Sequence, residues 1–461
     1  MRPLPSAKPL LRSPLLCPLL LALAAASCTS PAPKPLAQFN VREFGAKGDN
    51  ATKDTVAFQK TLDACAAAGG GEVVVAAGGN YLIGSVEMHS NTTLRLEKGV
   101  FVIESPDMDD YPLIEGKFEG EVAQVHRGLI FARNAENITI AGPGGFAANA
   151  GIAGARNPRA PVVIETVSCR NVILDGFNLQ YDRPVGRDVW CIHPLFCTNV
   201  VAKDLYIRST GTNGDGMDVD SCSGVVVDHC DISAGDDAIS LKSGRGLDAV
   251  RTAKPTENVL IQNSRLASVH FAAVGIGTEI SGGVRHVRIE NCTISGVQNA
   301  IFIKSRDGRG GFMEDISGEN LVVEASPTFI GIDLMSKGIA GKEPVPGEVE
   351  QWTRVQNIRF KNVQLNNVDY IVQVQPVTDR NGNIAPNAGT GEPNIGVPPA
   401  RPIEGFKLEN ITGTARHGFV LTNIKNVDFS GINVTGYSGK LYTLDNVTGK
   451  GLGEPAAKII P

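Results

Sequence analysis

A short apolar segment recurs along the chain, and this repeat restricts the folds that the sequence can form. Each copy begins with a turn residue, often Asn, continues with alternating apolar residues and closes with Asn, Asp or Gly. Alternation over about five residues is typical of a β-strand. The copies read ENITIAG from Glu136, RNVILDG from Arg170, TNVVAKD from Thr198, SGVVVDH from Ser223, ENVLIQN from Glu257, RHVRIEN from Arg285, QNIRFKN from Gln356, EGFKLEN from Glu404 and KNVDFSG from Lys425.

The spacing of these copies predicts a solenoid. They follow one another at intervals of roughly 20 to 35 residues, with longer gaps late in the chain. No heptads or helical periodicity lie between them, which favours a parallel β-helix over a helical repeat. The 461 residues include 52 glycines and only 6% aromatic residues, a composition that suits repetitive β-structure. We therefore expect an all-β chain in which residues 37–461 form one parallel β-helix.

The cysteines support stacked coils. Cys169, Cys197 and Cys222 share one place in the repeat, and Cys230 and Cys292 share another. Residues at equivalent positions on successive coils lie about 4.8 Å apart. We therefore expect most of these cysteines to form apolar ladders in the core, although an exported chain could oxidise them. A metal cluster or a required set of disulfides is the less favoured interpretation.

A solenoid needs a capped end, and a helix is expected to provide one. The segment TKDTVAFQKTLDACAAAGGG offers Thr52 or Thr55 as the N-cap and ends at Gly69 to Gly71. The apolar face of this short N-terminal helix is predicted to comprise Val56, Gln59, Leu62 and Ala66.

The first 28 residues have the pattern of an export signal. Arg2, Lys8 and Arg12 precede the apolar stretch PLLCPLLLALAAASC, which is too short for a typical membrane-spanning helix. The pattern resembles a bacterial lipoprotein signal, with Cys28 as the lipidated residue that anchors the protein to a membrane. An ordinary secretory signal is the alternative, and either one implies a periplasmic, cell-surface or secreted protein. Residues 29–36 are expected to be a Pro-rich tether.

Two adjacent aspartates, in the segment AGDDAISLKSG from Ala234, suggest catalytic chemistry. The segments DGMDVDS from Asp215, DAISLKS from Asp237 and NAIFIKS from Asn299 can be aligned. Met217 and Val219, Ile239 and Leu241, and Ile301 and Ile303 then share one parity and face the core, whereas the other parity faces out, with Asp218 and Asp220, Ser240 and Lys242, and Phe302 and Lys304. In this frame Asp215 and Asp237 occupy one column on adjacent coils, next to Asp236. Mutual repulsion and burial can keep one of such carboxyl groups protonated near neutral pH.

Cations surround this acidic cluster. Lys242 and Lys304 project from the same face, and further basic residues lie on these coils or their loops, namely Arg245, Arg251, His270, Arg285, Arg306 and Arg309. The net charge of the chain is -5, which gives no support for nucleic-acid binding. A basic ring around carboxylates suits an anionic substrate that is cut by an acid and a base. Taken singly, each Asp could be only a turn residue and each cation a solvated side chain.

The stretch NGDGMDVDSCSGVVVDHCDISAGDDAISLKSG resembles glycoside hydrolase family 28, the polygalacturonase-like pectin hydrolases. Asn213 and Asp215 match the Asn-x-Asp signature of that family, and residues 235–237 match its Gly-Asp-Asp signature. The resemblance implies a single-stranded right-handed parallel β-helix and an inverting glycosidase for pectic polysaccharide or oligosaccharide. It makes Asp236 the general acid and assigns the activation of water to Asp215 and Asp237. It implies a monomer that needs neither a metal ion nor another cofactor.

Two departures from the family pattern concern the substrate. The Gly-His-Gly signature appears as VHFAAVGIGTE, in which His270 is the counterpart of the catalytic-site His and Phe271 replaces a Gly. The Arg-Ile-Lys signature appears as FIK, so Phe302 replaces the Arg while Lys304 remains. The expected substrate-binding residues are therefore Asn213, Lys242, Lys304, Phe302, Arg306 and Arg309, with Arg306 able to supply the lost charge. Homogalacturonan, rhamnogalacturonan and substituted galacturonan all stay open as substrates.

Two other function classes remain open at this stage. A β-helix polysaccharide lyase would use the carboxylates to hold calcium and a basic residue to abstract a proton, leaving an unsaturated product. A non-catalytic β-helix would bind glycans at the cell surface without cutting them.

Overall fold

A computed structural model describes residues 36–149, 158–181, 190–305, 309–334, 352–374 and 401–453. The predicted signal segment, its lipidation site Cys28, residues 29–35 of the predicted tether and Arg306 lie outside these residues. None of the described helices is long and apolar enough to cross a membrane.

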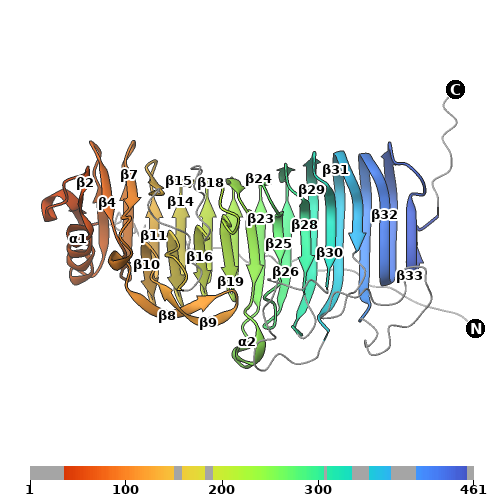
Figure 1. Cartoon of the computed structure of the whole chain (residues 1–461), viewed down its shortest axis with the longest axis horizontal. Coiled ribbons are helices and arrows are strands. Elements are labelled where there is room, and N and C mark those ends of the chain that lie inside the picture. Colours follow the sequence, from red (N-terminus) through yellow and green to blue (C-terminus); the bar gives the residue numbers. More distant parts are fainter. Residues whose placement is uncertain are drawn as a thin grey trace, which may run out of the picture. The chain divides into compact units, whose positions relative to one another are not determined.

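The chain from Ala37 onward is one compact unit and forms the predicted parallel β-helix. Successive coils stack side by side, and each coil adds one strand to each of three parallel sheets (Figure 1). We call them sheets 1, 2 and 3. Sheet 1, which carries the predicted carboxylates, contains β5 (Val86–Met88), β10 (Ile130–Arg133), β13 (Ile164–Val167), β16 (Ile192–Leu195), β19 (Met217–Asp220), β22 (Ile239–Lys242), β25 (Ala272–Ile276), β28 (Asn299–Lys304) and β30 (Thr328–Asp333).

The other two sheets complete each coil. Sheet 2 contains β1 (Gln38–Asn40), β3 (Gly71–Val75), β6 (Thr92–Leu96), β11 (Glu136–Ala141), β14 (Arg170–Asp175), β17 (Thr198–Lys203), β20 (Ser223–Asp228), β23 (Thr256–Gln262), β26 (Val284–Glu290) and part of β29 (Phe312–Glu324). Sheet 3 contains β2 (Asp49–Lys53), β4 (Asn80–Ile83), β7 (Phe101–Glu104), β12 (Gly145–Ala147), β15 (Asn178–Tyr181), β18 (Tyr206–Ser209), β21 (Asp231–Ala234), β24 (Arg265–Ser268) and β27 (Thr293–Ser295). The last coils are built from long bent strands, β31 (Arg354–Val374), β32 (Ile403–Thr435) and β33 (Tyr442–Lys450).

The recurring segments of the sequence form sheet 2. All of them except the last pair in register from one coil to the next, as in the pairing of Val172 with Val200. Their second residue has a positive φ, which explains the frequent Asn, since Asn tolerates the left-handed region. The side-chain amides also stack, and Asn171 donates to Asn137 as Asn199 donates to Asn171. The stacked Asn side chains therefore fix one corner of the coils that carry them.

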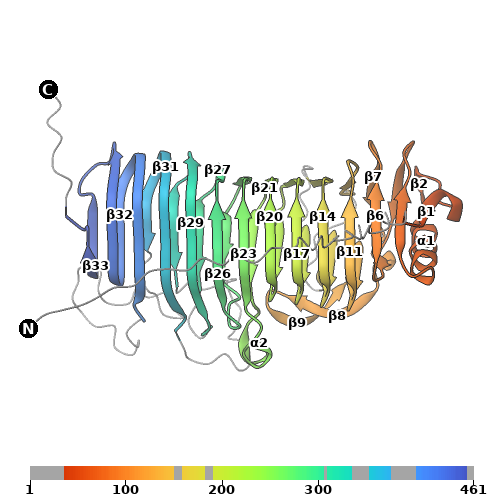
Figure 2. The same ribbon diagram turned by 180° about the vertical axis from the view of Figure 1, so that it is seen from behind.

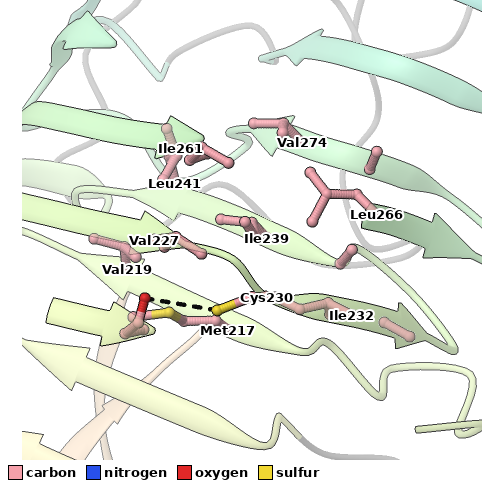
Figure 3. Packing of buried hydrophobic residues seen from close by; sticks show 14 of the residues in the cluster. Met217, Val219, Val227, Cys230, Ile232, Ile239, Leu241, Ile261, Leu266 and Val274 are labelled. Atoms are coloured by element: carbon pink, nitrogen blue, oxygen red, sulfur yellow. Dashed lines mark hydrogen bonds between the residues drawn. The ribbon is translucent and has the colours of Figure 1, made fainter. Parts of the chain in front are cut away.

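The interior of the coils is apolar, and the cysteines lie in it as predicted. Met217, Ile239 and Val274 stack along the core side of sheet 1 (Figure 3). The seven cysteines among the described residues are buried, and none of them takes part in a disulfide. The backbone N–H of Cys197 points at Sγ of Cys222 at 3.2 Å, which places these two residues on adjacent coils.

The predicted capping helix is α1 (Thr55–Ala67), which lies at the N-terminal end of the solenoid (Figures 1 and 2). The predicted apolar face was partly wrong, because Val56 is 65% exposed and the buried residues are Ala57, Phe58, Thr61, Leu62 and Cys65. Phe58 determines the orientation, since its ring packs edge-on against Tyr81. Neither predicted threonine is the cap: Asp54 is the N-cap residue, and its carboxylate accepts from the N–H groups of Lys47 and Gly48.

An antiparallel hairpin that the sequence did not predict interrupts the coils between β7 and β10. Its strands are β8 (Leu113–Phe118) and β9 (Glu121–His126). The hairpin extends along the side of the solenoid from the coil of β10 toward that of β19, as both views show (Figures 1 and 2). Phe118 and Val125 pack with Ala160, Val162 and Trp190 in a small apolar cluster of their own, which attaches the hairpin to sheet 1.

The remaining described helices are short. Two 3₁₀ turns, η1 (Val41–Phe44) and η2 (Met108–Asp110), lie close to the N-terminal coils. Helix α2 (Gly246–Thr252) follows β22 and extends from the side of the coils (Figure 1).

Candidate active site

The register of β19 and β22 brings the predicted carboxylates together. Met217 pairs with Ile239 and Asp220 with Lys242, which is the predicted frame. Just before these strands, the N–H of Gly216 donates to the carbonyl of Asp237 at 3.0 Å. Asp215 and Asp237 therefore each lie two residues before a strand of sheet 1, and the two strands are adjacent. Asp236 precedes Asp237 in the same turn.

The carboxylate of Asp237 is held by two donors. Lys304 Nζ lies 2.8 Å from its Oδ2, and the N–H of Ala272 donates to its Oδ1 at 3.2 Å. The carboxylate lies over Gly275 on the next strand, where a Cβ would overlap its oxygens. Because Gly275 has no side chain, the carboxylate of Asp237 can lie flat on the sheet. These two contacts fix the position of the Asp237 carboxylate.

Asp236 differs from its neighbours because it is partly exposed. Burial, and then the charge of Asp237, raise the pKa of Asp236 to about 7. A carboxyl group with such a pKa retains its proton at mildly acidic pH and can donate it to a leaving group.

Asp215 lies deeper and belongs to a second ion cluster. It is 3% exposed, and its Oδ2 is 3.6 Å from Lys242 Nζ. Burial and the charge of Asp218 raise the pKa of Asp215 well above its usual value. Lys242 lies 2.6 Å from Asp218 Oδ1 and 3.9 Å from the centroid of the Trp190 ring. Although burial opposes it, the charges of Asp218 and Glu279 keep the pKa of Lys242 raised.

Two carboxylates in this cluster were not assigned a role from the sequence. Asp218 is fully buried, although its parity correctly placed it on the outer side of the sheet. Glu279 is 7% exposed, and despite burial the charges of Lys242, Arg309 and Lys304 lower its pKa. The parity of the strand MDVD is the signal that could have identified Asp218. Glu279 follows the end of β25, where the alternating pattern stops.

The hairpin explains why outward-facing residues of sheet 1 are buried. One outward column contains Phe131, Glu165, His193, Asp218 and Ser240, none of which is more than 3% exposed. Phe118 of the hairpin packs 5.3 Å from the ring of Trp190. The tip reaches further, because the N–H of Arg245 donates to Gly120 at 3.2 Å and its guanidinium pairs with Glu121 at 2.9 Å.

Buried ions continue beneath the hairpin. Arg159 pairs with Glu165 at 2.8 Å, and His193 lies 3.5 Å from the same carboxylate. Although burial opposes it, the charge of Arg159 lowers the pKa of Glu165 to about 2. These groups are structural partners of one another, and the exposed side of the site lies toward Asp236 and the following coils.

His270 and Asn213 flank Asp236 through a shared glycine. The N–H of His270 donates to the carbonyl of Gly235 at 3.1 Å, and the N–H of Gly235 donates to Gly214 at 3.1 Å. His270 is exposed and Asn213 is partly exposed. The backbones of both predicted residues therefore lie beside the turn that carries Asp236.

The two phenylalanines that depart from the family pattern lie side by side. The ring centroids of Phe271 and Phe302 are 5.7 Å apart, and both rings are partly exposed. Lys304 Nζ lies 4.4 Å from the Phe271 centroid and 5.5 Å from that of Phe302. Phe302 faces outward, as its parity predicted.

Several of the predicted cations do not lie at the exposed side of this site. Arg309 is buried close to Glu279, and Arg245 is held by the hairpin. Arg251 is exposed in α2, 3.7 Å from Asp248. Arg285 lies on sheet 2, where it pairs with Glu257 at 2.6 Å. The expected basic ring is therefore smaller than predicted, since coil position alone does not determine the sheet on which a residue lies.

Sequence and structure comparisons now bear on this site. The model of glycosyl hydrolases family 28 matches residues 65–346, which contain all the carboxylates described above. The chain belongs to this family. A probable polygalacturonase from Vitis vinifera is 28% identical over 290 residues, which cover 59% of this chain and 58% of that protein.

Solved structures show the same fold. A hyperthermoactive exopolygalacturonase from Thermotoga maritima superposes with a TM-score of 0.70 at 24% identity, over 86% of this chain and 93% of that one. A family 28 exopolygalacturonase from Yersinia enterocolitica gives a TM-score of 0.71 at 19% identity, over 92% of this chain and 80% of that one. The all-β parallel β-helix and the family resemblance are confirmed.

Proposed function

We propose that this family 28 protein is an inverting glycosidase that cleaves uronic-acid-containing pectic polysaccharide or oligosaccharide. The observation that carries the proposal is the contrast between two adjacent carboxyl groups. Asp236 is partly exposed with its pKa raised to about 7, while Asp237 is buried against Lys304. Such a contrast provides an acid and a base in one site.

Asp236 is assigned as the general acid. Its proton passes to the glycosidic oxygen as the bond from that oxygen to the anomeric carbon breaks. Asp237 takes a proton from water, whose oxygen attacks the anomeric carbon from the opposite face, so the configuration inverts. Before the next turnover, Asp237 releases to solvent the proton that it took from water. Asp236 takes up a proton from solvent.

Asp215 is assigned to the same water as Asp237. Burial and the charge of Asp218 raise the pKa of Asp215, which suits a carboxyl group that keeps a proton and orients this water through a hydrogen bond. Lys242 and Lys304 limit the repulsion between these carboxylates, and His270 and Asn213 are assigned to the substrate at the rim of the site.

The hairpin favours attack at a chain end. Its residues contact Trp190 and Arg245, and the outward column of sheet 1 is buried as far as Ser240, whereas Phe302, further along the same column, is partly exposed. A polysaccharide that continued in both directions would have to pass through the hairpin. We therefore propose an exo mode of action, in which one terminal unit binds between the hairpin and Asp236.

A lyase is less well supported by the contacts. A calcium ion would need carboxylates free to coordinate it. In this site Lys304 pairs with Asp237, and Lys242 pairs with Asp218 while lying 3.6 Å from Asp215. A protein that only binds glycans does not need a carboxyl group with a raised pKa. The raised pKa of Asp236 therefore supports catalysis over binding alone.

The test is the Asp236→Asn variant with a mixture of pectic oligosaccharides. We expect a loss of at least a thousandfold in release of reducing ends, because general acid catalysis and the protonation of the leaving group are lost together. Circular dichroism establishes that the variant is folded. Turnover close to that of the wild type, or a wild-type product with an unsaturated sugar, would contradict the assignment.

Export remains part of the proposal. We propose that residues 1–28 direct the protein out of the cytoplasm and that a lipid on Cys28 anchors it at the cell surface, where polymeric substrate is met.

A further inference from the structure

Phe271 and Phe302 occupy the place where a family 28 site would be expected to bind a carboxylate, and their contact changes what this place can bind. They come from different coils, Phe271 just before β25 and Phe302 within β28. Sequence alone presents them as two separate departures. In the structure the rings are 5.7 Å apart with a tilt of 43°, so they form one apolar surface. We call this pair the aromatic platform.

The platform is held rigidly. The backbone carbonyl of Phe271 accepts from the N–H groups of Gln298 at 2.9 Å and Asn299 at 3.1 Å. Its own N–H donates to Ser268 Oγ at 2.9 Å. The backbone of Phe271 is therefore fixed before a ligand binds, and Phe302 lies within β28, paired on both sides.

The column around Phe302 leaves its ring uncovered by neighbouring side chains of the same column. Phe302 pairs with Gly275 on the preceding strand and with Gly331 on the following one. The place beside Gly275 is occupied by the Asp237 carboxylate. At Gly331 the side-chain amide of Asn299 is the nearest group to the position of a Cβ, and Cδ2 of Phe302 lies 3.2 Å from that position. Because both neighbours in the column are glycines, no side chain of the column covers the Phe302 ring, which stays partly exposed next to the Asp237 carboxylate.

Lys304 does not serve as a free cation in this place. Its Nζ lies 2.8 Å from Asp237 Oδ2, between the catalytic carboxylate and the two rings, and its side chain is 12% exposed. The charge of Asp237 raises the pKa of Lys304 although burial opposes it. A second carboxylate that approached Lys304 would compete with Asp237 and would meet the negative faces of the aromatic rings. Its desolvation would not be repaid by the lysine.

We propose that the aromatic platform binds a sugar ring without an ionised carboxyl group on the side of the scissile bond away from the hairpin. The ring can be an esterified uronate or a neutral sugar, because both present apolar C–H groups to Phe302 and neither carries a charge. The inference rests on the proposed function for the position of the scissile bond and narrows its substrate class. It makes Phe271 and Phe302 specificity-determining residues.

Binding to the inactive Asp236→Asn protein tests the proposal without turnover. Three probes are compared by calorimetry: unmodified trigalacturonate, its methyl ester, and an oligosaccharide in which galacturonate alternates with a neutral sugar. We expect at least one of the uncharged-ring probes to bind at least tenfold more tightly than trigalacturonate. The two uncharged probes distinguish an esterified from a neutral ring.

The variant Phe302→Arg, made in the same background, supplies the decisive comparison. It places a cation on the platform and is expected to reverse the preference toward trigalacturonate. Tyr206→Arg is the matched control, since Tyr206 is a 39% exposed aromatic residue on β18 of sheet 3. A preference for trigalacturonate in the parent protein, a ratio unchanged by Phe302→Arg, or no binding of any probe would overturn the platform.

Arg306 offers the competing explanation, and its variant separates the two. If Arg306 supplied the lost charge, the parent protein would favour trigalacturonate and Arg306→Gln would abolish that preference, which would also overturn the platform. Wild-type turnover of the same probes reports separately on the proposed function. Cleavage of trigalacturonate with the highest efficiency would uphold the glycosidase and refute the platform.

Discussion

The Asp236→Asn variant should stabilise the fold, and by an amount that depends on pH. A carboxyl group whose pKa is higher in the folded protein than in the unfolded chain penalises folding once both forms are ionised. The pKa of Asp236 is raised from 3.8 to about 7. Each pKa unit corresponds to about 1.4 kcal/mol, so about three units give an upper limit of about 4 kcal/mol.

The sign and the window follow from that shift. Below pH 3.8 the group is protonated in both states and contributes nothing, and between pH 3.8 and about 7 the folded protein loses stability as pH rises. The carboxamide of the variant is buried as well and carries its own desolvation cost, so the gain stays below the upper limit. We therefore expect the variant to exceed the wild type by about 2 to 4 kcal/mol at pH 8 and by less than about 1 kcal/mol at pH 4.

Urea unfolding at pH 4 and pH 8, followed by the fluorescence of Trp190 and Trp352, measures this difference. Asp248→Asn is the control, because Asp248 is an exposed carboxylate of α2 with only a 3.7 Å contact to Arg251. It should change stability by less than about 0.5 kcal/mol at either pH. An Asp236→Asn difference that is equal at the two pH values, or larger at pH 4, would refute the reasoning.

Two further changes probe the site and its enclosure. Gly275→Ala adds a Cβ that overlaps the carboxylate of Asp237, so kcat should fall at least a hundredfold while the β-sheet circular dichroism signal persists; unchanged kcat would show that Asp237 need not lie flat on the sheet. Replacing residues 113–126 by a short Gly-Ser turn removes the hairpin that covers sheet 1, so the products at low conversion should change from one short species to a range of lengths in chromatography. The same single product from the shortened protein would show that the hairpin does not determine the exo mode.

The sequence predicted the solenoid and the local register, because both depend on spacing along the chain. Alternation placed Met217 and Ile239 inside and Asp218 and Lys242 outside, and β19 and β22 pair in that frame. The stacked position of Cys197 and Cys222 followed from the same repeat. Such properties involve neighbouring coils only.

The remaining features depend on contacts between segments that the repeat does not relate. Asp218 is buried because a hairpin about a hundred residues earlier covers its sheet, and outward parity carries no information about such a cover. Val56 is exposed because the contact between the rings of Phe58 and Tyr81 determines which face of α1 packs on the first coils. The spacing of apolar residues in the sequence does not reveal this contact. The contact between Phe271 and Phe302 could not be predicted from the sequence, because two departures from a family pattern do not indicate the distance between the two residues in space.

The stereochemistry of the first product tests the central claim most directly. Proton NMR spectra recorded during the first minutes of hydrolysis of an α-linked galacturonide oligomer report the configuration of the newly released reducing end, before it equilibrates. An acid at Asp236 and a base at Asp237 acting on opposite faces predict that the β-anomer appears first. Initial release of the α-anomer would contradict the assignment of these two carboxyl groups.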